Sequence, residues 1–255
     1  MLMQSNVIII SVVRDYQMYD TCVRKNPFAN GHTLCPLDNT RENKTIPVRY
    51  NEFLNSYDFA VPAWLVFCHE DFEFKQAVDP LLEPLDKNVL YGPIGARTDV
   101  RWFLMYTWRL IGQIRESTKD GSNTRHVGTP YPTGTPVETF DCQCLIVHSE
   151  LIRRTGLRFD ENLSFDLYIE DFCINAKENH GVPSQVLAVE CQHWSGGTVR
   201  ERYYHQEAYL NKKYPHCCYT GTSSYSIGKP GFARKLNEAM KKGIRFFLRF
   251  LSVRR

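Results

Sequence analysis

The sequence contains no hydrophobic run long enough to span a bilayer, although 43% of its 255 residues are hydrophobic. Its first residues lack the charged, apolar and small-residue stretches that mark a secretion signal. It contains no internal repeat, and a charged fraction of 23% is ordinary for a globular protein, which excludes the fibrous and disordered classes. A chain of this length folds most simply as one domain, with room for a small appendage.

The nine cysteines include no Cys-x-x-Cys pair. They are scattered, odd in number and mostly embedded in apolar segments, a pattern that favours reduced core thiols in a cytosolic protein over disulfides or structural zinc. The cluster His216-Cys217-Cys218 offers adjacent metal ligands, but without a distant second pair it makes a poor tetrahedral set. We therefore expect neither a disulfide framework nor a zinc finger.

Positive charge is concentrated at the C-terminal end. Residues 229–255 contain nine Lys or Arg and one acid, a net charge of +8, whereas the preceding 228 residues carry −5, since the whole chain carries +3. Between Phe232 and Leu251, apolar and basic side chains fall on opposite arcs at helical spacing. This pattern predicts an amphipathic helix that binds an anionic membrane surface. The alternative is a terminal helix that packs on its own domain or on a partner subunit.

Short strands alternate with helices along residues 7–193. Strands are predicted at Val7–Val13, Trp64–Phe67, Val89–Gly95, Phe140–His148 and Val186–Glu190, and helices at Gln17–Lys25, Ile46–Ser56, Leu81–Leu85, Ser149–Thr155 and Asp166–Asn179. The alternation predicts an α/β fold with a mostly parallel sheet flanked by helices on both faces. Gly112–Thr135, rich in glycine, threonine, proline and charge, is predicted to be a long mobile loop.

Charged and imidazole side chains follow three of these segments. His69 to Glu73 come directly after an apolar strand, Glu170-Asp171 lie in a helix, and His193 follows a later strand. In an α/β sheet the carboxyl ends of neighbouring strands converge on one crevice. There Asp71 and His193 could ligate a divalent cation, and Asp171 could accept a proton. Taken singly, each also fits a simpler interpretation: a solvated strand end, a structural histidine and the solvated face of a helix.

An ordered set of motifs covering Val7 to Tyr214 resembles the family 2-type glycosyltransferases of the GT-A fold. It is most similar to a bacterial subgroup whose metal motif reads His-x-Asp. The motifs are Ile9-Ile10-Ser11-Val12-Val13, Asp38-Asn39, Arg49-Tyr50-Asn51, Phe67-Cys68-His69-Glu70-Asp71, Gly92-Pro93-Ile94-Gly95-Ala96-Arg97, Gly156-Leu157-Arg158-Phe159-Asp160-Glu161, Tyr168-Ile169-Glu170-Asp171-Phe172-Cys173 and His193-Trp194-Ser195-Gly196-Gly197. The resemblance implies a GT-A, Rossmann-like domain over residues 1–228, followed by the basic amphipathic helix over 229–255.

The resemblance also implies roles for individual residues. Those that would bind the donor nucleotide are Ser11, Val13, Asp38, Asn51, His69 and Ser195. Asp71 and His193 would hold Mn²⁺ or Mg²⁺ on the diphosphate, and Asp141 would contact the acceptor or the donor sugar. Asp171 would deprotonate the acceptor hydroxyl. Because the family often has a second acid where this chain has Ile169, Glu170 or Asp166 is the alternative base.

The sequence thus predicts an enzyme that transfers a sugar from a nucleotide-diphosphate donor to a glycan or lipid-linked glycan, with inversion. Its expected place is bacterial surface polysaccharide or lipopolysaccharide synthesis, peripheral on the cytoplasmic face of the cell membrane, with no nucleic-acid partner. A sugar-phosphate nucleotidyltransferase is a rival, but such enzymes carry a glycine-rich, arginine-bearing signature where Val13-Arg14-Asp15-Tyr16 has no glycine. The other rival is a non-catalytic nucleotide-sugar-binding scaffold, against which intact Asp71, Asp171 and His193 argue.

Overall fold

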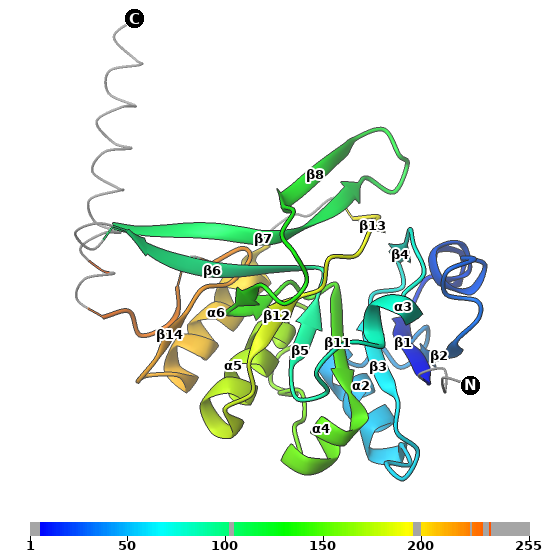
Figure 1. Ribbon diagram of the computed structural model, residues 1–255, viewed down its shortest axis with the longest axis horizontal. Helices are drawn as coiled ribbons and strands as arrows, with labels where there is room; N and C mark the ends of the chain where they lie inside the picture. Colours follow the sequence, from blue (N-terminus) through cyan, green and yellow to red (C-terminus); the bar gives the residue numbers. More distant parts are fainter. Residues whose placement is uncertain (1–5, 102–104, 196–199, 225, 232–234, 236–255) are drawn as a thin grey trace, which may run out of the picture.

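The computed structural model describes residues 6–101, 105–195, 200–224, 226–231 and 235. One sheet has seven strands, in the order β2 (Thr33–Asp38), β1 (Val7–Val13), β3 (Trp64–Cys68), β11 (Cys144–His148), β5 (Leu90–Gly92), β12 (Ser184–Val186) and β9 (Pro136–Val137). A second has the order β10 (Thr139–Phe140), β6 (Ile94–Arg101), β7 (Met105–Ser117), β13 (Cys191–His193) and β4 (Phe72–Phe74), with β8 (Thr124–Thr129) paired to β7 (Figure 1).

The seven-stranded sheet is mixed, so the prediction of a mostly parallel sheet needs correction. β1 is parallel to β2 and β3, and β12 is parallel to β5. In contrast, β11 runs antiparallel to both β3 and β5, and β9 runs antiparallel to β12. All five residues of β11 are buried, like those of its neighbour β3. An apolar run of this kind indicates burial on both faces but carries no information about strand direction.

Helices cover both faces of this sheet, as predicted. They are α1 (Tyr16–Tyr19) continuing as the π-helix η1 (Asp20–Arg24), α2 (Ile46–Ser56), α3 (Asp79–Leu82), α4 (Ser149–Thr155), α5 (Tyr168–His180) and α6 (Glu201–Lys213). Alternate side chains of β1 enter two separate cores. Ile8, Ile10 and Val12 pack in the core that contains buried residues of α2, α4, α5 and α6, whereas Ile9 and Val13 pack in the core that contains those of η1 and α3.

The segment Gly112–Thr135 is not the predicted long mobile loop, because most of it forms a β-hairpin. β7 and β8 pair antiparallel from Ile111–Thr129 to Ser117–Thr124, with a bulge at Ile111/Gly112. Gly112 has φ +87°, and a Cβ there would lie 2.2 Å from the carbonyl oxygen of Pro93, so the bulge requires glycine. In Figure 1 this hairpin lies above the ends of β5 and β11. Gly112, which contributed to the prediction of a loop, instead forms the bulge in β7.

Two other predictions have different outcomes. The strand expected at Val186–Glu190 is replaced by β12, which ends at Val186, and β13, which begins at Cys191. The amphipathic helix expected within residues 229–255 lies almost entirely outside the described residues. The last elements that the structure describes are the strands β14 (Cys218–Tyr219) and β15 (Ile227–Gly228). Among the helices that are described, none has the length and apolarity needed to cross a membrane. All nine cysteines are free, as predicted.

Candidate functional site

His69, Asp71 and His193 form a compact triad at the ends of β3 and β13. His69 and Asp71 follow the last residue of β3, and antiparallel pairing of β13 with β4 sets His193 opposite Phe72, next to Asp71 in sequence. His193 Nε2 lies 3.2 Å from Asp71 Oδ1, and His69 Nδ1 lies 4.0 Å from the same oxygen. One ligand atom from each residue lies within 4.8 Å of the others. The structure therefore brings together Asp71 and His193, the two predicted metal ligands, and places beside them His69, which was predicted to bind the donor nucleotide.

The chemistry of the triad fits a divalent cation. Although His193 Nε2 is close to Asp71, neither of its buried ring nitrogens makes a well-directed hydrogen bond to the described residues. Burial lowers the pKa of His69 to about 4, which leaves this imidazole neutral and able to ligate. Burial alone would raise the pKa of Asp71, but His193 and His69 hold it below its ordinary value, so the carboxylate is ionised. Two imidazoles beside one carboxylate suit Mn²⁺ better than Mg²⁺.

Burial would also lower the pKa of His193, but contact with Asp71 outweighs it and raises that pKa above its ordinary value. His193 is therefore the triad member that would have to release a proton when a cation binds. Cation affinity should accordingly increase with pH through the titration of His193.

Two cavities meet at this triad. An inner cavity of about 330 Å³ and an outer cleft of about 280 Å³ share four lining residues, which are His69, Asp71, Phe165 and Ser195. The outer cleft is also lined by Val12, Arg14, Ile46, Tyr50, Glu70 and Lys119. The inner cavity extends to Glu116 and Arg125 of the hairpin and to Asp141 and Glu170. A ligand that filled both spaces would cross the triad.

The strand alternation of β1 decides which of its residues reach the outer cleft. Val12 and Arg14 line it, whereas the predicted Ser11 and Val13 are both fully buried on the other face. Ser11 Oγ lies 3.4 Å from Cys68 Sγ, which satisfies the hydroxyl inside the protein. The structure therefore does not place Ser11 and Val13 in the cleft. The sequence motif located the correct strand end but missed Val12 and Arg14.

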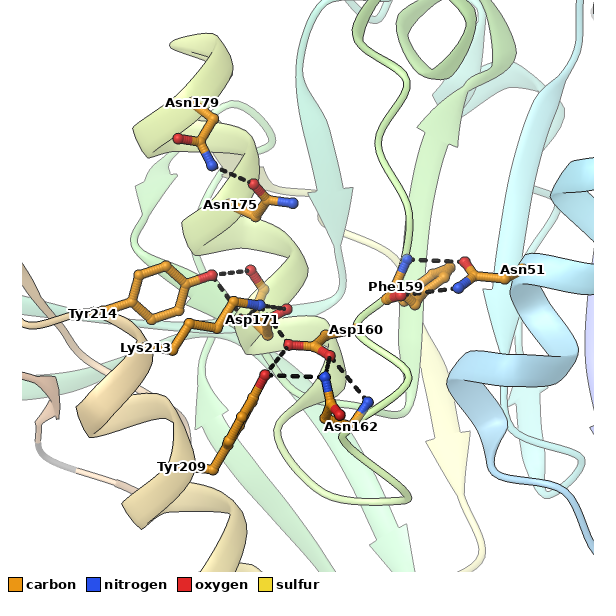
Figure 2. Close-up of polar contacts among 10 residues, drawn as sticks. All are labelled: Asn51, Phe159, Asp160, Asn162, Asp171, Asn175, Asn179, Tyr209, Lys213 and Tyr214. Atoms are coloured by element: carbon orange, nitrogen blue, oxygen red, sulfur yellow. Dashed lines mark hydrogen bonds and ion pairs between the residues drawn. The ribbon is translucent and has the colours of Figure 1, made fainter.

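Of the other residues predicted to bind the donor, His69 and Ser195 line both cavities, but Asn51 and Asp38 line neither. The Asn51 amide donates to the Phe159 carbonyl at 2.9 Å, and its oxygen accepts from the Phe159 N–H (Figure 2). The same amide also donates to Glu161 at 2.9 Å. These bonds join α2 to the segment before α5. Asp38 is exposed and accepts hydrogen bonds from Thr40. Both residues are accounted for by local structure.

Glu170 is the acid of α5 that faces the inner cavity. It is only 3% exposed, and Cys142 Sγ donates to its Oε2 at 3.1 Å. Burial, reinforced by the nearby Asp141, raises the pKa of Glu170 to about 8, and burial also raises the pKa of Asp141. The α5 helix begins after Leu167, a non-glycine residue at φ +61° that itself lines the cavity. A left-handed non-glycine residue and a strongly perturbed buried carboxyl are both features that cluster at functional sites.

Asp171, the residue predicted as base, faces away from both cavities. Lys213 Nζ lies 2.7 and 3.0 Å from its two carboxylate oxygens, and the Tyr214 hydroxyl donates to it at 2.7 Å (Figure 2). The same lysine binds Asp160 at 2.6 Å. Asp171 is 1% exposed, pairs with α6 and lines neither cavity. The structure therefore does not bring Asp171 to the cavities, whereas Glu170, the alternative that the motif had left open, lines the inner one.

The remaining lining residues fall into those expected and those missed. Asp141, predicted to contact the acceptor or the donor sugar, lines the inner cavity, and so does Asp166, which accepts a hydrogen bond from Arg202 Nε at 2.6 Å. Glu116, Arg125 and Thr222 were not foreseen. The first two lie in the hairpin that the sequence presented as a loop, and Thr222 lies beyond the motifs altogether. No sequence pattern here could have connected them to the site.

Comparison with known proteins gave little at the level of sequence: no family model matches the chain, and no curated protein matches it. Among solved structures it is similar to GalNAc-T7, in a crystal structure with UDP, GalNAc and Mn²⁺. The sequence identity is 11% and the TM-score 0.45, over 76% of this chain and 45% of the other. The chain therefore spans less than half the length of the structure it matches. A likeness of this degree assigns no ligand to the present chain.

Proposed function

We propose that the protein is a glycosyltransferase that moves a sugar from a nucleotide-diphosphate donor to an acceptor hydroxyl. The observation that carries the proposal is the place of the His69–Asp71–His193 triad, between the outer cleft and an inner cavity that contains the buried Glu170. A nucleotide sugar consists of a nucleoside, a diphosphate and a sugar, and the outer cleft, the triad and the inner cavity follow one another in the same order. The nucleoside fits the outer cleft, the diphosphate the triad, and the sugar the inner cavity.

In this proposal Glu170 acts as the general base. It accepts the proton of the acceptor hydroxyl while the acceptor oxygen bonds to the anomeric carbon, and the bond from that carbon to the diphosphate oxygen breaks with its electron pair. A single displacement of this kind inverts the anomeric configuration. A base with a pKa of about 8 is well matched to proton transfer near neutral pH. A divalent cation held by His69, Asp71 and His193 would supply charge neutralisation on the leaving diphosphate.

The two rival functions fit the geometry less well. A non-catalytic scaffold would gain nothing from keeping Glu170 buried among groups that raise its pKa, because a neutral side chain would bind without that cost. A nucleotidyltransferase needs a phosphate-binding loop after the first strand. Here the N–H groups of Arg14 and Asp15 already donate to Glu70 Oε2, at 2.6 and 2.9 Å. Sugar transfer is the function that employs both cavities and the triad.

The direct test is Mn²⁺-dependent turnover of nucleotide sugars by the Asp71→Ala variant. We expect a loss of about 100-fold or more in turnover and in Mn²⁺ affinity, because the triad loses its only carboxylate. Asp58→Asn is the matched control, since Asp58 is an exposed acid outside both cavities and should leave both quantities unchanged. Unaltered turnover in Asp71→Ala would refute the proposal.

We further propose that the enzyme works on a surface glycan at the inner face of a bacterial cell membrane, with residues 229–255 as the membrane contact. The support is the charge of this segment, nine basic residues against one acid. The full chain should float with vesicles containing anionic phosphatidylglycerol and less with neutral phosphatidylcholine vesicles. A chain ending at Gly228 should lose most of this flotation. Equal flotation of the two chains would end the membrane proposal.

A further inference from the structure

The inner cavity is lined mainly by acidic polar groups. Five carboxylates line it: Asp71, Glu116, Asp141, Asp166 and Glu170. Among its described lining residues the only Lys or Arg is Arg125, and that guanidinium already binds Glu116, with Nε at 3.1 Å and Nη2 at 2.7 Å from one carboxylate oxygen. Asp166 likewise has a partner in Arg202. Asp141 and Glu170 are the cavity carboxyl groups that lack both a Lys or Arg partner and a histidine partner at salt-bridge distance among the described residues.

Hydrogen-bond acceptors also outnumber donors in this cavity. Asp141 Oδ2 and Glu170 Oε1 converge on the hydroxyl of Thr222, at 2.9 and 3.4 Å, but that hydroxyl has a single proton to give. Gln143 Oε1 is an acceptor that is buried without a hydrogen-bond partner among the described residues, and Gln143 lines the cavity. Buried polar groups are rarely left unpaired in a functional state. The cavity is therefore suited to a ligand that donates hydrogen bonds.

We propose that the sugar unit bound in the inner cavity is neutral or amine-bearing, and that the cavity rejects units that carry a carboxylate or phosphate. This inference rests on the proposed function, because it assumes that a sugar occupies the cavity. Sugar hydroxyls and amines supply the missing donors to Asp141, Glu170 and Gln143. An acidic group would add an acceptor where acceptors are already in excess.

An acidic sugar would also meet uncompensated like charge. To bind it, the protein would have to desolvate a second anion beside Asp141 without a free Lys or Arg among the described lining residues, since Arg125 is committed to Glu116. Rejection of this kind acts through repulsion and unpaired acceptors rather than through size. It therefore discriminates between sugars of nearly equal volume.

The test uses donor pairs that differ only in replacement of a hydroxymethyl group by a carboxylate. The pairs are UDP-glucose with UDP-glucuronic acid and GDP-mannose with GDP-mannuronic acid, with UDP and GDP alone as references. Dissociation constants of the full chain are measured by calorimetry with MnCl₂. For the base that the protein binds, we expect the acidic sugar to bind about tenfold or more weakly than its neutral partner. Equal or tighter binding of the acidic sugar would overturn the inference.

Two variants connect the discrimination to the residues named. Glu116→Gln removes one carboxylate and releases Arg125, so the difference within a pair should shrink several-fold. Glu201→Gln makes the same chemical change on the exposed first turn of α6 and should leave the ratio as it is. A ratio that Glu116→Gln does not change would refute the assigned cause. Failure of UDP, GDP and all four sugars to bind would instead count against the proposed function, because the free nucleotides report on the outer cleft and the triad without the inner cavity.

Discussion

Glu170 and Asp171 are neighbours in α5 and almost fully buried, at 3% and 1% exposure, but their electrostatic surroundings are opposite. Glu170 faces Asp141, Cys142 and Thr222, and no cation pairs with it among the described residues. Asp171 faces Lys213, which contacts both of its carboxylate oxygens. Because successive residues of a helix are about 100° apart, one acid points into the inner cavity and the other toward α6.

The two acids differ in whether each has an oppositely charged partner among the described residues. In the cluster around Asp171, burial alone would lower the pKa of Lys213, but Asp171 and Asp160 raise it above its ordinary value. Burial alone would raise the pKa of Asp160, but its bond to Lys213 outweighs burial, and the pKa of Asp160 falls to about 2. Each charge there has a partner. Glu170 has none, so its ionised form is costly in the resting protein. A buried acid of this second kind indicates a site where chemistry or binding supplies what is missing.

The largest effect is expected from Glu170→Gln. Removing the general base should lower turnover by about 10²- to 10⁴-fold, whereas the melting temperature should stay the same or rise, because a costly buried acid has been replaced by a neutral isostere. Steady-state kinetics and thermal unfolding of the same preparation measure both. Turnover within a few-fold of the parent protein would show that the two acids have been assigned the wrong way round.

Lys213→Met should produce the converse result. It leaves Asp171 buried without its cation, so we expect a loss of roughly 2–3 kcal/mol in the free energy of unfolding in urea. The folded fraction should retain most of its turnover, since Lys213 lines neither cavity. Lys212→Met is the control, because Lys212 is its exposed neighbour and should shift stability by at most about 0.5 kcal/mol. A loss of turnover without a loss of stability would contradict the structural role.

A smaller effect should appear in the pH dependence of stability. The pKa of Glu170 is raised from an ordinary 4.5 to about 8, so between these values the folded state holds a proton that the unfolded state has lost. The free energy of unfolding therefore decreases as pH rises through this window, by about 1–3 kcal/mol, and Glu170→Gln should remove that decrease. Urea unfolding of both proteins from pH 5 to 8, without added metal, measures the difference. Parallel curves for the two would show that Glu170 is not perturbed.

Sequence reasoning located the elements with strong local signals. Val7–Val13, Ile46–Ser56 and Ser149–Thr155 have the predicted bounds, and the predicted metal ligands Asp71 and His193 lie close together. The failures depend on partners distant in the chain. Whether Glu170 or Asp171 faces the cavity is decided by Lys213, 42 residues beyond Asp171, and β8 is recognisable as a strand only beside β7. Local composition contains neither fact.

The inner cavity owes one wall to the short segment that follows α6. Thr222 lies in this segment, and its hydroxyl donates to Asp141. Two hydrogen bonds hold the segment in place: Thr139 Oγ1 donates to the Thr220 carbonyl at 2.7 Å, and Trp108 Nε1 donates to the Gly221 carbonyl at 3.0 Å. β14 within this segment pairs with β15, which ends at Gly228. A shortened chain for expression that stopped at Tyr214, where the last long helix ends, would thus remove this wall of the inner cavity. The shortest unit that keeps the cavity intact has to include Gly228.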